Sequence, residues 1–162
     1  MDQHTLEARI RDRIEDDWLT PSQLQAWQFL QRFDGTPNRV VNIYGTEGSG
    51  KSFLAWFLER KGHAIHSDWD RRTPPTLPRM VLDNAPTDRS SARSIRPLVD
   101  ALGLQQIILI SRRRVDEAAM PAFELEVTND DIEHFAANLY RHFGIVMPEI
   151  IYPNFKLILS EL

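Results

Sequence analysis

The sequence predicts an α/β fold in which a five-stranded parallel sheet lies between two layers of helices. Short apolar, β-branched segments alternate along the chain with segments of helical periodicity, which is the pattern of repeated strand–helix units. Three of the strand candidates are continuous apolar runs, as expected for central strands that are covered on both faces. A chain of 162 residues is long enough for one domain with a substantial core.

Two helices are expected before the first strand. Residues 4–18 carry apolar side chains at every fourth position, which places these side chains on one face of a helix. Thr20 and Pro21 are residue types favoured at the N-cap and at the first helical position. A second helix is therefore expected, with its body over Gln23–Phe33.

A glycine-rich loop joins the first strand, Arg39–Tyr44, to the helix that follows it. Its sequence is Gly45-Thr46-Glu47-Gly48-Ser49-Gly50-Lys51-Ser52, which matches the G-x-x-x-x-G-K-S pattern of phosphate-binding loops. Glycines allow the backbone to turn its N–H groups inward, and the helix N-terminus adds partial positive charge. We expect these eight residues and Phe53 to bind a nucleotide, with Lys51 at the β- and γ-phosphates and Ser52 at Mg²⁺.

The segment Met80–Asp83 is an apolar run that ends in an acid, as in the second motif of P-loop proteins. Asp83 would lie at the carboxyl end of its strand, where ligands bind in open α/β sheets, and we expect it to share Mg²⁺ with Ser52. Asn84 stands where many P-loop ATPases have a glutamate that acts as a general base. Because an amide cannot accept a proton from the attacking water, weak or absent hydrolysis is expected.

Polar and basic residues follow the fourth strand, Gln106–Ser111. Ser111 is a candidate for contact with the γ-phosphate, so the catalytic candidates are Lys51, Asp83, Asn84 and Ser111. Arg112, Arg113 and Arg114 are candidates for phosphate or nucleic-acid contact, or for an arginine finger offered to a neighbouring subunit. A solvent-exposed loop explains these three arginines equally well.

The remaining segments complete the α/β pattern. Strands are expected at His63–His66 and Ala122–Val127, and helices at Ser90–Leu102 and from Asn129 to about His142. Residues 144–162 are rich in apolar side chains and contain two prolines. We expect this tail either to cap the core of the nucleotide-binding domain formed by residues 1–143 or to bind a partner.

Composition limits the classes of function. The net charge of −4 argues against a strongly cationic nucleic-acid binder, so contact with DNA is expected to be indirect or local. The chain has no cysteine, which excludes disulfides and thiolate zinc sites and fits a reducing compartment. The N-terminal residues are polar and no stretch approaches about 18 consecutive apolar residues, so neither a signal peptide nor a membrane span is expected. We expect a cytoplasmic protein.

Together these motifs resemble the AAA+ superfamily of P-loop NTPases, and within it the DnaA-like initiators, their regulatory relatives and the helicase-loader ATPases. The resemblance covers roughly residues 20–143 and rests on the glycine loop, on Met80–Asp83 and on Ile107–Ser111 as a sensor-one strand. It implies the sheet order 5-1-4-3-2 and ATP or ADP bound with Mg²⁺ at a subunit junction. It also implies action through protein partners or a homo-oligomer in a DNA-related process, such as the regulation of replication initiation or helicase loading.

Besides Asn84, which replaces the expected acid, the chain departs from this family in two places. Only 31 residues separate Lys51 from Asp83, which leaves little room for the usual helix between the second and third strands. Little chain remains beyond Tyr140 for a full helical lid, so no sensor-two arginine can be assigned.

A small P-loop kinase is the alternative interpretation. The loop also satisfies G-x-x-G-x-G-K-S, and Ser67-Asp68-Trp69-Asp70 is similar to the D-x-D substrate segment of shikimate-type kinases. No glycine-rich substrate loop follows Met80–Asp83, which argues against a kinase. A third possibility is an adaptor that retains the fold without the nucleotide.

Overall fold

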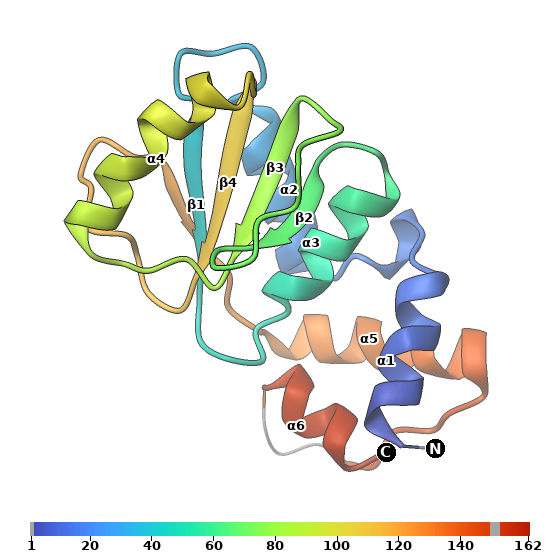
Figure 1. The fold of residues 1–162 in the computed structure, drawn as a ribbon. Coiled ribbons are helices and arrows are strands. Elements are labelled where there is room, and N and C mark those ends of the chain that lie inside the picture. Colours follow the sequence, from blue (N-terminus) through green and yellow to red (C-terminus); the bar gives the residue numbers. More distant parts are fainter. Residues whose placement is uncertain (1, 150–152) are drawn as a thin grey trace.

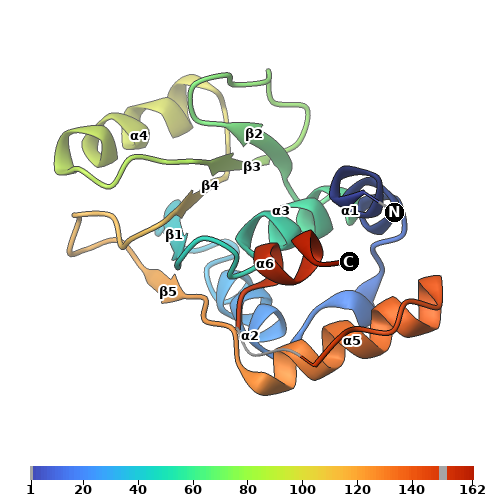
Figure 2. The same ribbon diagram turned by 90° about the horizontal axis from the view of Figure 1, so that it is seen from below.

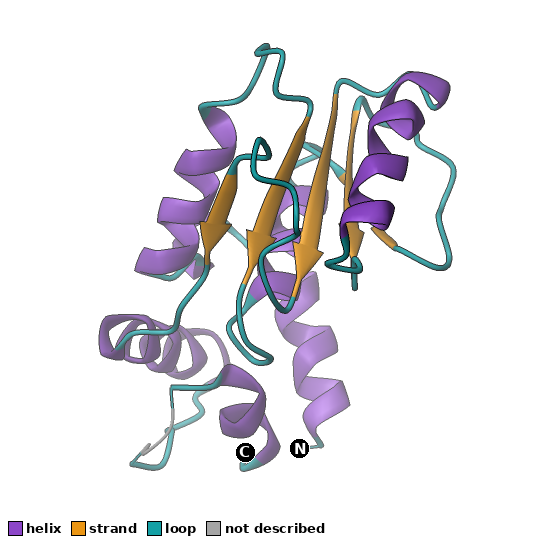
Figure 3. Cartoon of the chain, turned by 90° about the vertical axis from the view of Figure 1, so that its left-hand side faces the viewer, coloured by secondary structure: helices purple, strands orange, loops and turns teal. Residues whose placement is uncertain are grey.

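The computed structural model describes residues 2–149 and 153–162, and its described part contains a five-stranded parallel sheet with helices on both faces (Figures 1 and 3). The strands are β1 (Val40–Tyr44), β2 (Ile65–Asp68), β3 (Arg79–Asp83), β4 (Gln106–Ser111) and β5 (Ala122–Glu124). Their order is β2-β3-β4-β1-β5, and each adjacent pair is parallel. This is the predicted order 5-1-4-3-2 read from the opposite edge, so the predicted fold class is confirmed.

The helices surround the sheet and also close one end of it. They are α1 (Gln3–Asp12), α2 (Pro21–Gln31), α3 (Lys51–Arg60), α4 (Arg89–Ala101), α5 (Asn129–Phe143) and α6 (Phe155–Ser160), with a short 3₁₀ helix, η1, at Asp16–Trp18. Helices α1, α5 and α6 lie beyond the carboxyl ends of the strands (Figures 1 and 2). None of the helices in residues 2–149 and 153–162 is both long enough and apolar enough to cross a membrane.

Two hydrophobic clusters hold the sheet between its helices, because successive strand side chains point to opposite faces. One cluster joins Val41, Ile43, Val81, Ile108 and Ile110 to apolar residues of α1, α2 and α3. The other joins Val40, Met80, Leu82, Ile107 and Leu109 to Ala92, Ile95 and Val99 of α4. The strands are therefore covered on both faces, as their continuous apolar sequences predict.

Several predicted elements have different boundaries in the structure. The expected helix over residues 4–18 ends at Asp12, and the chain then forms η1, in which Trp18 is fully buried. The second strand begins at Ile65 rather than at His63, because the amides of His63 and Ala64 bind the carbonyl of Leu58 and thereby close the end of α3.

The fifth strand is also shorter than predicted. The segment Ala122–Val127 forms a strand only as far as Glu124. The next amide, that of Leu125, still donates to the carbonyl of Tyr44 at the end of β1. The chain then leaves the sheet towards Thr128, which caps α5.

Asp131 joins the N-termini of α2 and α5. Its carboxylate is fully buried and accepts hydrogen bonds from the amide and hydroxyl of Ser22, at 2.8 and 2.7 Å, and from the amide and hydroxyl of Thr128, at 2.7 and 2.8 Å. Burial raises the pKa of Asp131, but the hydrogen bonds from Ser22 and Thr128 outweigh it and hold the pKa below its usual value. This carboxylate therefore contributes stability as an anion.

We expect the Asp131→Asn variant to be less stable than the wild type by about 2 kcal/mol at neutral pH, because the amide offers one acceptor oxygen to four donors. A depressed pKa contributes stability above the unfolded-state value of about 3.9, and this contribution is lost as the pH falls through the folded-state pKa. Urea unfolding at several pH values should therefore show the difference between wild type and variant shrinking below about pH 4. The exposed neighbour Asp130→Asn is the control, and an equal difference at every pH would contradict the assignment.

Candidate functional site

The loop between β1 and α3 lies at the carboxyl end of the sheet and requires its glycines. Gly48 and Gly50 have φ values of +80° and +90°, which disfavour other residues. A Cβ atom at Gly45 would lie 2.4 Å from the carbonyl oxygen of Leu125, and one at Gly48 would lie 1.9 Å from Asn154 Oδ1. The three loop glycines of the motif therefore permit both the turn and the close approach of neighbouring segments.

The polar groups of this loop are satisfied unequally. Carbonyl oxygens are bound at Gly45, Thr46, Glu47, Gly48 and Gly50, by donors from Lys51, Asn154, Phe155, Gln23 and the helix backbone. Within the described residues, no acceptor is paired with the amides of Gly48, Gly50, Lys51 or Ser52. Bound carbonyls and free amides at a helix N-terminus make an electropositive concavity that fits an anion such as phosphate.

Lys51 lies within this loop and is nearly buried, with 8% of its surface exposed. Its ammonium donates to the carbonyls of Gly45 and Thr46, both at 2.7 Å, and to the Ser49 hydroxyl at 3.2 Å. Burial lowers the pKa of Lys51, and the charge of Asp83 opposes this shift. The only ligands of the ammonium among the described residues are uncharged oxygens, which phosphate oxygens can replace.

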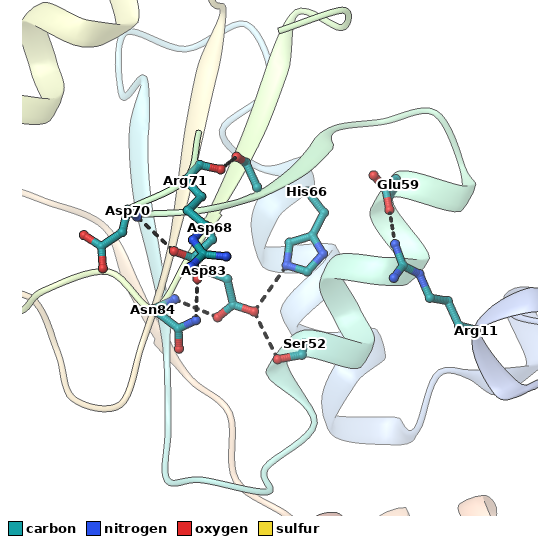
Figure 4. A network of polar contacts seen from close by, with 10 residues as sticks. Arg11, Ser52, Glu59, His66, Asp68, Asp70, Arg71, Asp83 and Asn84 are labelled. Carbon is teal, nitrogen blue, oxygen red and sulfur yellow. Dashed lines mark hydrogen bonds and ion pairs between the residues drawn. The ribbon is translucent and has the colours of Figure 1, made fainter. Parts of the chain in front are cut away.

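Asp83 and Ser52 form the second part of the site, as Figure 4 shows. The Ser52 hydroxyl donates to Asp83 Oδ2 at 3.1 Å, and His66 Nε2 lies 3.2 Å from the same oxygen. Burial raises the pKa of Asp83, but hydrogen bonds from His66 and from the Asn84 amide outweigh it and lower the pKa. In residues 2–149 and 153–162 no cluster of acidic and histidine side chains could hold a metal unaided. Two oxygen ligands suit Mg²⁺, which takes its other ligands from phosphate and water.

Asn84 follows Asp83 in a left-handed backbone conformation, with φ of +56°. Its side-chain amide donates to Asp68 Oδ2 at 2.8 Å, and its backbone amide donates to Asp83 Oδ1 at 2.8 Å. Asp68 pairs in register with Asp83 across β2 and β3, so the sheet itself brings the two carboxyl groups together. The hydrogen bond from Asn84 lowers the pKa of Asp68.

Sequence reasoning did not place His66 beside the phosphate loop, and it named Asp68 only as part of the substrate segment of the kinase alternative. The sequence contains only part of the information that places these two residues at the site. Both residues belong to the strand that neighbours β3, but the register that sets His66 and Asp68 opposite Val81 and Asp83 depends on the folded sheet.

Ser111 lies at the end of β4 and is held by Asn42 of β1. The Asn42 side-chain amide donates to Ser111 Oγ at 2.9 Å, and its Oδ1 accepts from the Val115 amide at 3.0 Å. Ser111 in turn donates to the carbonyl of Arg113 at 2.7 Å. Asn42 is fully buried and was missed by sequence reasoning, although a polar residue inside an apolar strand is the signal that marks it.

The three arginines after β4 are all exposed but do not share one environment. Arg112 and Arg113 line the cleft above the phosphate loop, and the Arg112 guanidinium lies 3.9 Å from Glu47. Arg114 is not among the described residues that line this cleft. The structure therefore brings two of the three predicted phosphate contacts to the site.

A cleft of about 940 Å³ contains the site. Its polar side is formed by the loop, Asp83, Asn84 and Ser111, and its apolar side is formed by Ile10, Trp18, Phe53, Phe135, Phe155 and Leu159. A concave site with one apolar side and a few polar groups is typical of small-molecule binding sites of this size.

Comparisons with known proteins identify the fold but not a family. No protein-family model matches the sequence, and no curated protein matches it. Among the solved structures that match is one described as the crystal structure of a DNA replication initiation factor, with a TM-score of 0.66 and 14% sequence identity. The match covers 93% of this chain and 62% of that chain, so this chain spans less than two thirds of its neighbour's length. Together with the sheet order, this likeness shows an AAA+-like fold.

We expect the Asn42→Leu variant to lose about 2–3 kcal/mol of unfolding free energy, because it leaves the buried Val115 amide without its acceptor. Urea denaturation followed by circular dichroism measures the loss. Asn38→Ala, an exposed residue in the turn before β1, is the matched control and should stay within about 0.5 kcal/mol of the wild type. Equal stability of the two variants would show that the hydrogen bonds from Asn42 to Ser111 and Val115 do not stabilise the segment that follows β4.

Proposed function

We propose that this chain binds ATP or ADP with Mg²⁺ in the cleft above the phosphate loop. The observation that carries the proposal is the set of amides at Gly48, Gly50, Lys51 and Ser52, which have no acceptor among the described residues and lie at the N-terminus of α3 in the same loop as the Lys51 ammonium. Glycines at positions where a Cβ would collide with neighbouring atoms support the same conclusion. These groups bind and orient the phosphates, and the apolar side of the cleft offers a surface for the base.

Ser52 and Asp83 are the proposed magnesium ligands, and Ser111 the proposed contact to the γ-phosphate. The two magnesium ligands already lie 3.1 Å apart, and both are oxygen donors of the kind that Mg²⁺ prefers. When bound, the ion would neutralise charge on the phosphates. His66 and the Asn84 amide hold the Asp83 carboxylate in place for this role.

The proposed biological role is that of a nucleotide-dependent AAA+-like protein that acts through a protein partner or a second copy of itself, in a DNA-related process in the cytoplasm. The structural neighbour is described as a DNA replication initiation factor, which supports regulation of initiation or loading as the process. Exposed apolar side chains near the C-terminal helices, namely Tyr140, Val146 and Leu157, support a protein partner.

Hydrolysis in isolation is proposed to be weak. Asn84 cannot act as a general base, and its amide is oriented by Asp68. Asp68 is half-buried and its pKa is lowered, which makes it a poor proton acceptor. Nucleotide binding requires neither residue to accept a proton.

We expect calorimetric titration to show micromolar binding of ATP or ADP, about −8 kcal/mol, that is lost in Lys51→Ala. Lys61→Ala is the matched control, because Lys61 follows the same helix at its far end and pairs with Asp16. Ser52→Ala should retain binding without Mg²⁺ but lose the additional affinity that Mg²⁺ gives. Equal affinity in wild type and Lys51→Ala would refute the proposed site.

We expect the isolated wild-type protein to release phosphate from ATP at a rate close to that of the Lys51→Ala variant, which should not bind nucleotide. A panel of small hydroxyl and nucleotide acceptors, followed by ³¹P NMR, should show no phosphoryl transfer. Transfer to any acceptor would replace this proposal by the kinase interpretation, in which Asp68 and Asp70 would bind the substrate.

A further inference from the structure

Glu47 lies on the phosphate loop and attracts cations from two other segments. Lys156 Nζ of α6 lies 2.5 Å from Glu47 Oε1, and the Arg112 guanidinium after β4 lies 3.9 Å from Glu47 Oε2. All three side chains line the cleft that also contains Lys51 and Ser52. Two cations are thus held at the mouth of the phosphate site by a carboxylate that belongs to the loop itself.

The position of Lys156 is set by contacts other than its ion pair. The Asn154 side-chain amide donates to the Glu47 carbonyl at 3.0 Å, and the Phe155 amide donates to the Gly48 carbonyl at 2.9 Å. The Phe155 ring is buried and packs against Phe135, with 5.0 Å between ring centroids. Helix α6 thereby lies beyond the carboxyl ends of the strands, where it contacts α1 (Figure 1). Because these anchors use carbonyl oxygens, they leave the loop amides available.

The two ion pairs are of a kind that can be exchanged. The side chains of Glu47, Lys156 and Arg112 are 52%, 59% and 76% exposed. Exposed pairs of this type contribute little stability, since water and salt screen them. The hydrogen bond and charge of Lys156, with a smaller contribution from Arg112, lower the pKa of Glu47, so its carboxylate is ionised at neutral pH. A polyphosphate carries more negative charge than one carboxylate and attracts the same cations more strongly.

We propose that Glu47 is an internal competitor for the phosphates, holding Lys156 and Arg112 until a polyphosphate enters the cleft and takes both cations. Lys156 is then a phosphate-binding residue supplied by the C-terminal helix, and Glu47 weakens binding although it lies within the binding loop. This inference rests on the proposed nucleotide site. It adds an exchange of the partner of the Lys156 and Arg112 side chains, from the Glu47 carboxylate to phosphate, while the anchors at Asn154 and Phe155 hold α6 in place.

The test compares four variants with the wild type by calorimetric titration of ATP and of inorganic triphosphate. Glu47→Gln should bind both ligands roughly twofold to fivefold more tightly, and Lys156→Gln should bind both more weakly by a similar factor. The double variant Glu47→Gln/Lys156→Gln should bind more weakly than Glu47→Gln alone, because Lys156 contacts the phosphate directly. Glu59→Gln is the matched control, since Glu59 pairs with Arg11 in an exposed ion pair of α1 and α3.

The outcomes separate the two proposals. Absence of nucleotide binding in the wild type would overturn both. Binding that Lys51→Ala abolishes, with no tightening in Glu47→Gln, would overturn the competitor role alone. If Glu47→Gln bound ATP more tightly but inorganic triphosphate no more tightly than the wild type, the competitor role would also be overturned, because the exchange acts on phosphate charge. Thermal unfolding of each variant should give a midpoint close to that of the wild type, because exposed ion pairs contribute little stability.

Discussion

The arrangement of polar backbone groups in the loop after β1 is the constraint on which the rest of the site depends. A buried loop would normally satisfy both its donors and its acceptors, since unpaired buried amides carry a cost of about 1–3 kcal/mol each. Here Lys51, Asn154, Phe155 and Gln23 bind the carbonyl oxygens, while the amides of Gly48, Gly50, Lys51 and Ser52 have no acceptor among the residues that the structure describes. Segments from both ends of the chain thus hold the loop in a shape whose open donors face the cleft.

The sheet order explains why these groups meet. β1 and β3 flank β4 in the sheet. The carboxyl ends of these three strands therefore bring together the loop after β1, the acid that ends β3 and the serine that ends β4. Asn42 reinforces this junction, because its side chain crosses from β1 to Ser111. The candidate site and the packing therefore use the same strand ends, and side chains of α1, α5 and α6 line the cleft formed there.

Much of the fold could be predicted from the sequence because its signals are local. The apolar runs, the Thr20–Pro21 helix start and the glycine loop each depend on neighbouring residues. The contacts that position the site are long-range. Asp131 meets Ser22 across 109 residues, and Asn154 meets Glu47 across 107. Residue type alone does not reveal such pairs, and part of the predicted apolar tail, residues 150–152, lies outside the described residues.

The central position of β1 also has a consequence for how the chain acquires its structure. Val40 pairs in register with Ile107, and Asn42 pairs with Ala122, so β1 has no partner among the strands synthesised shortly after it. Loop closure over such separations slows folding. On the ribosome the glycine loop therefore emerges long before the strands that support it, and its assembly must await the synthesis of β4 and β5.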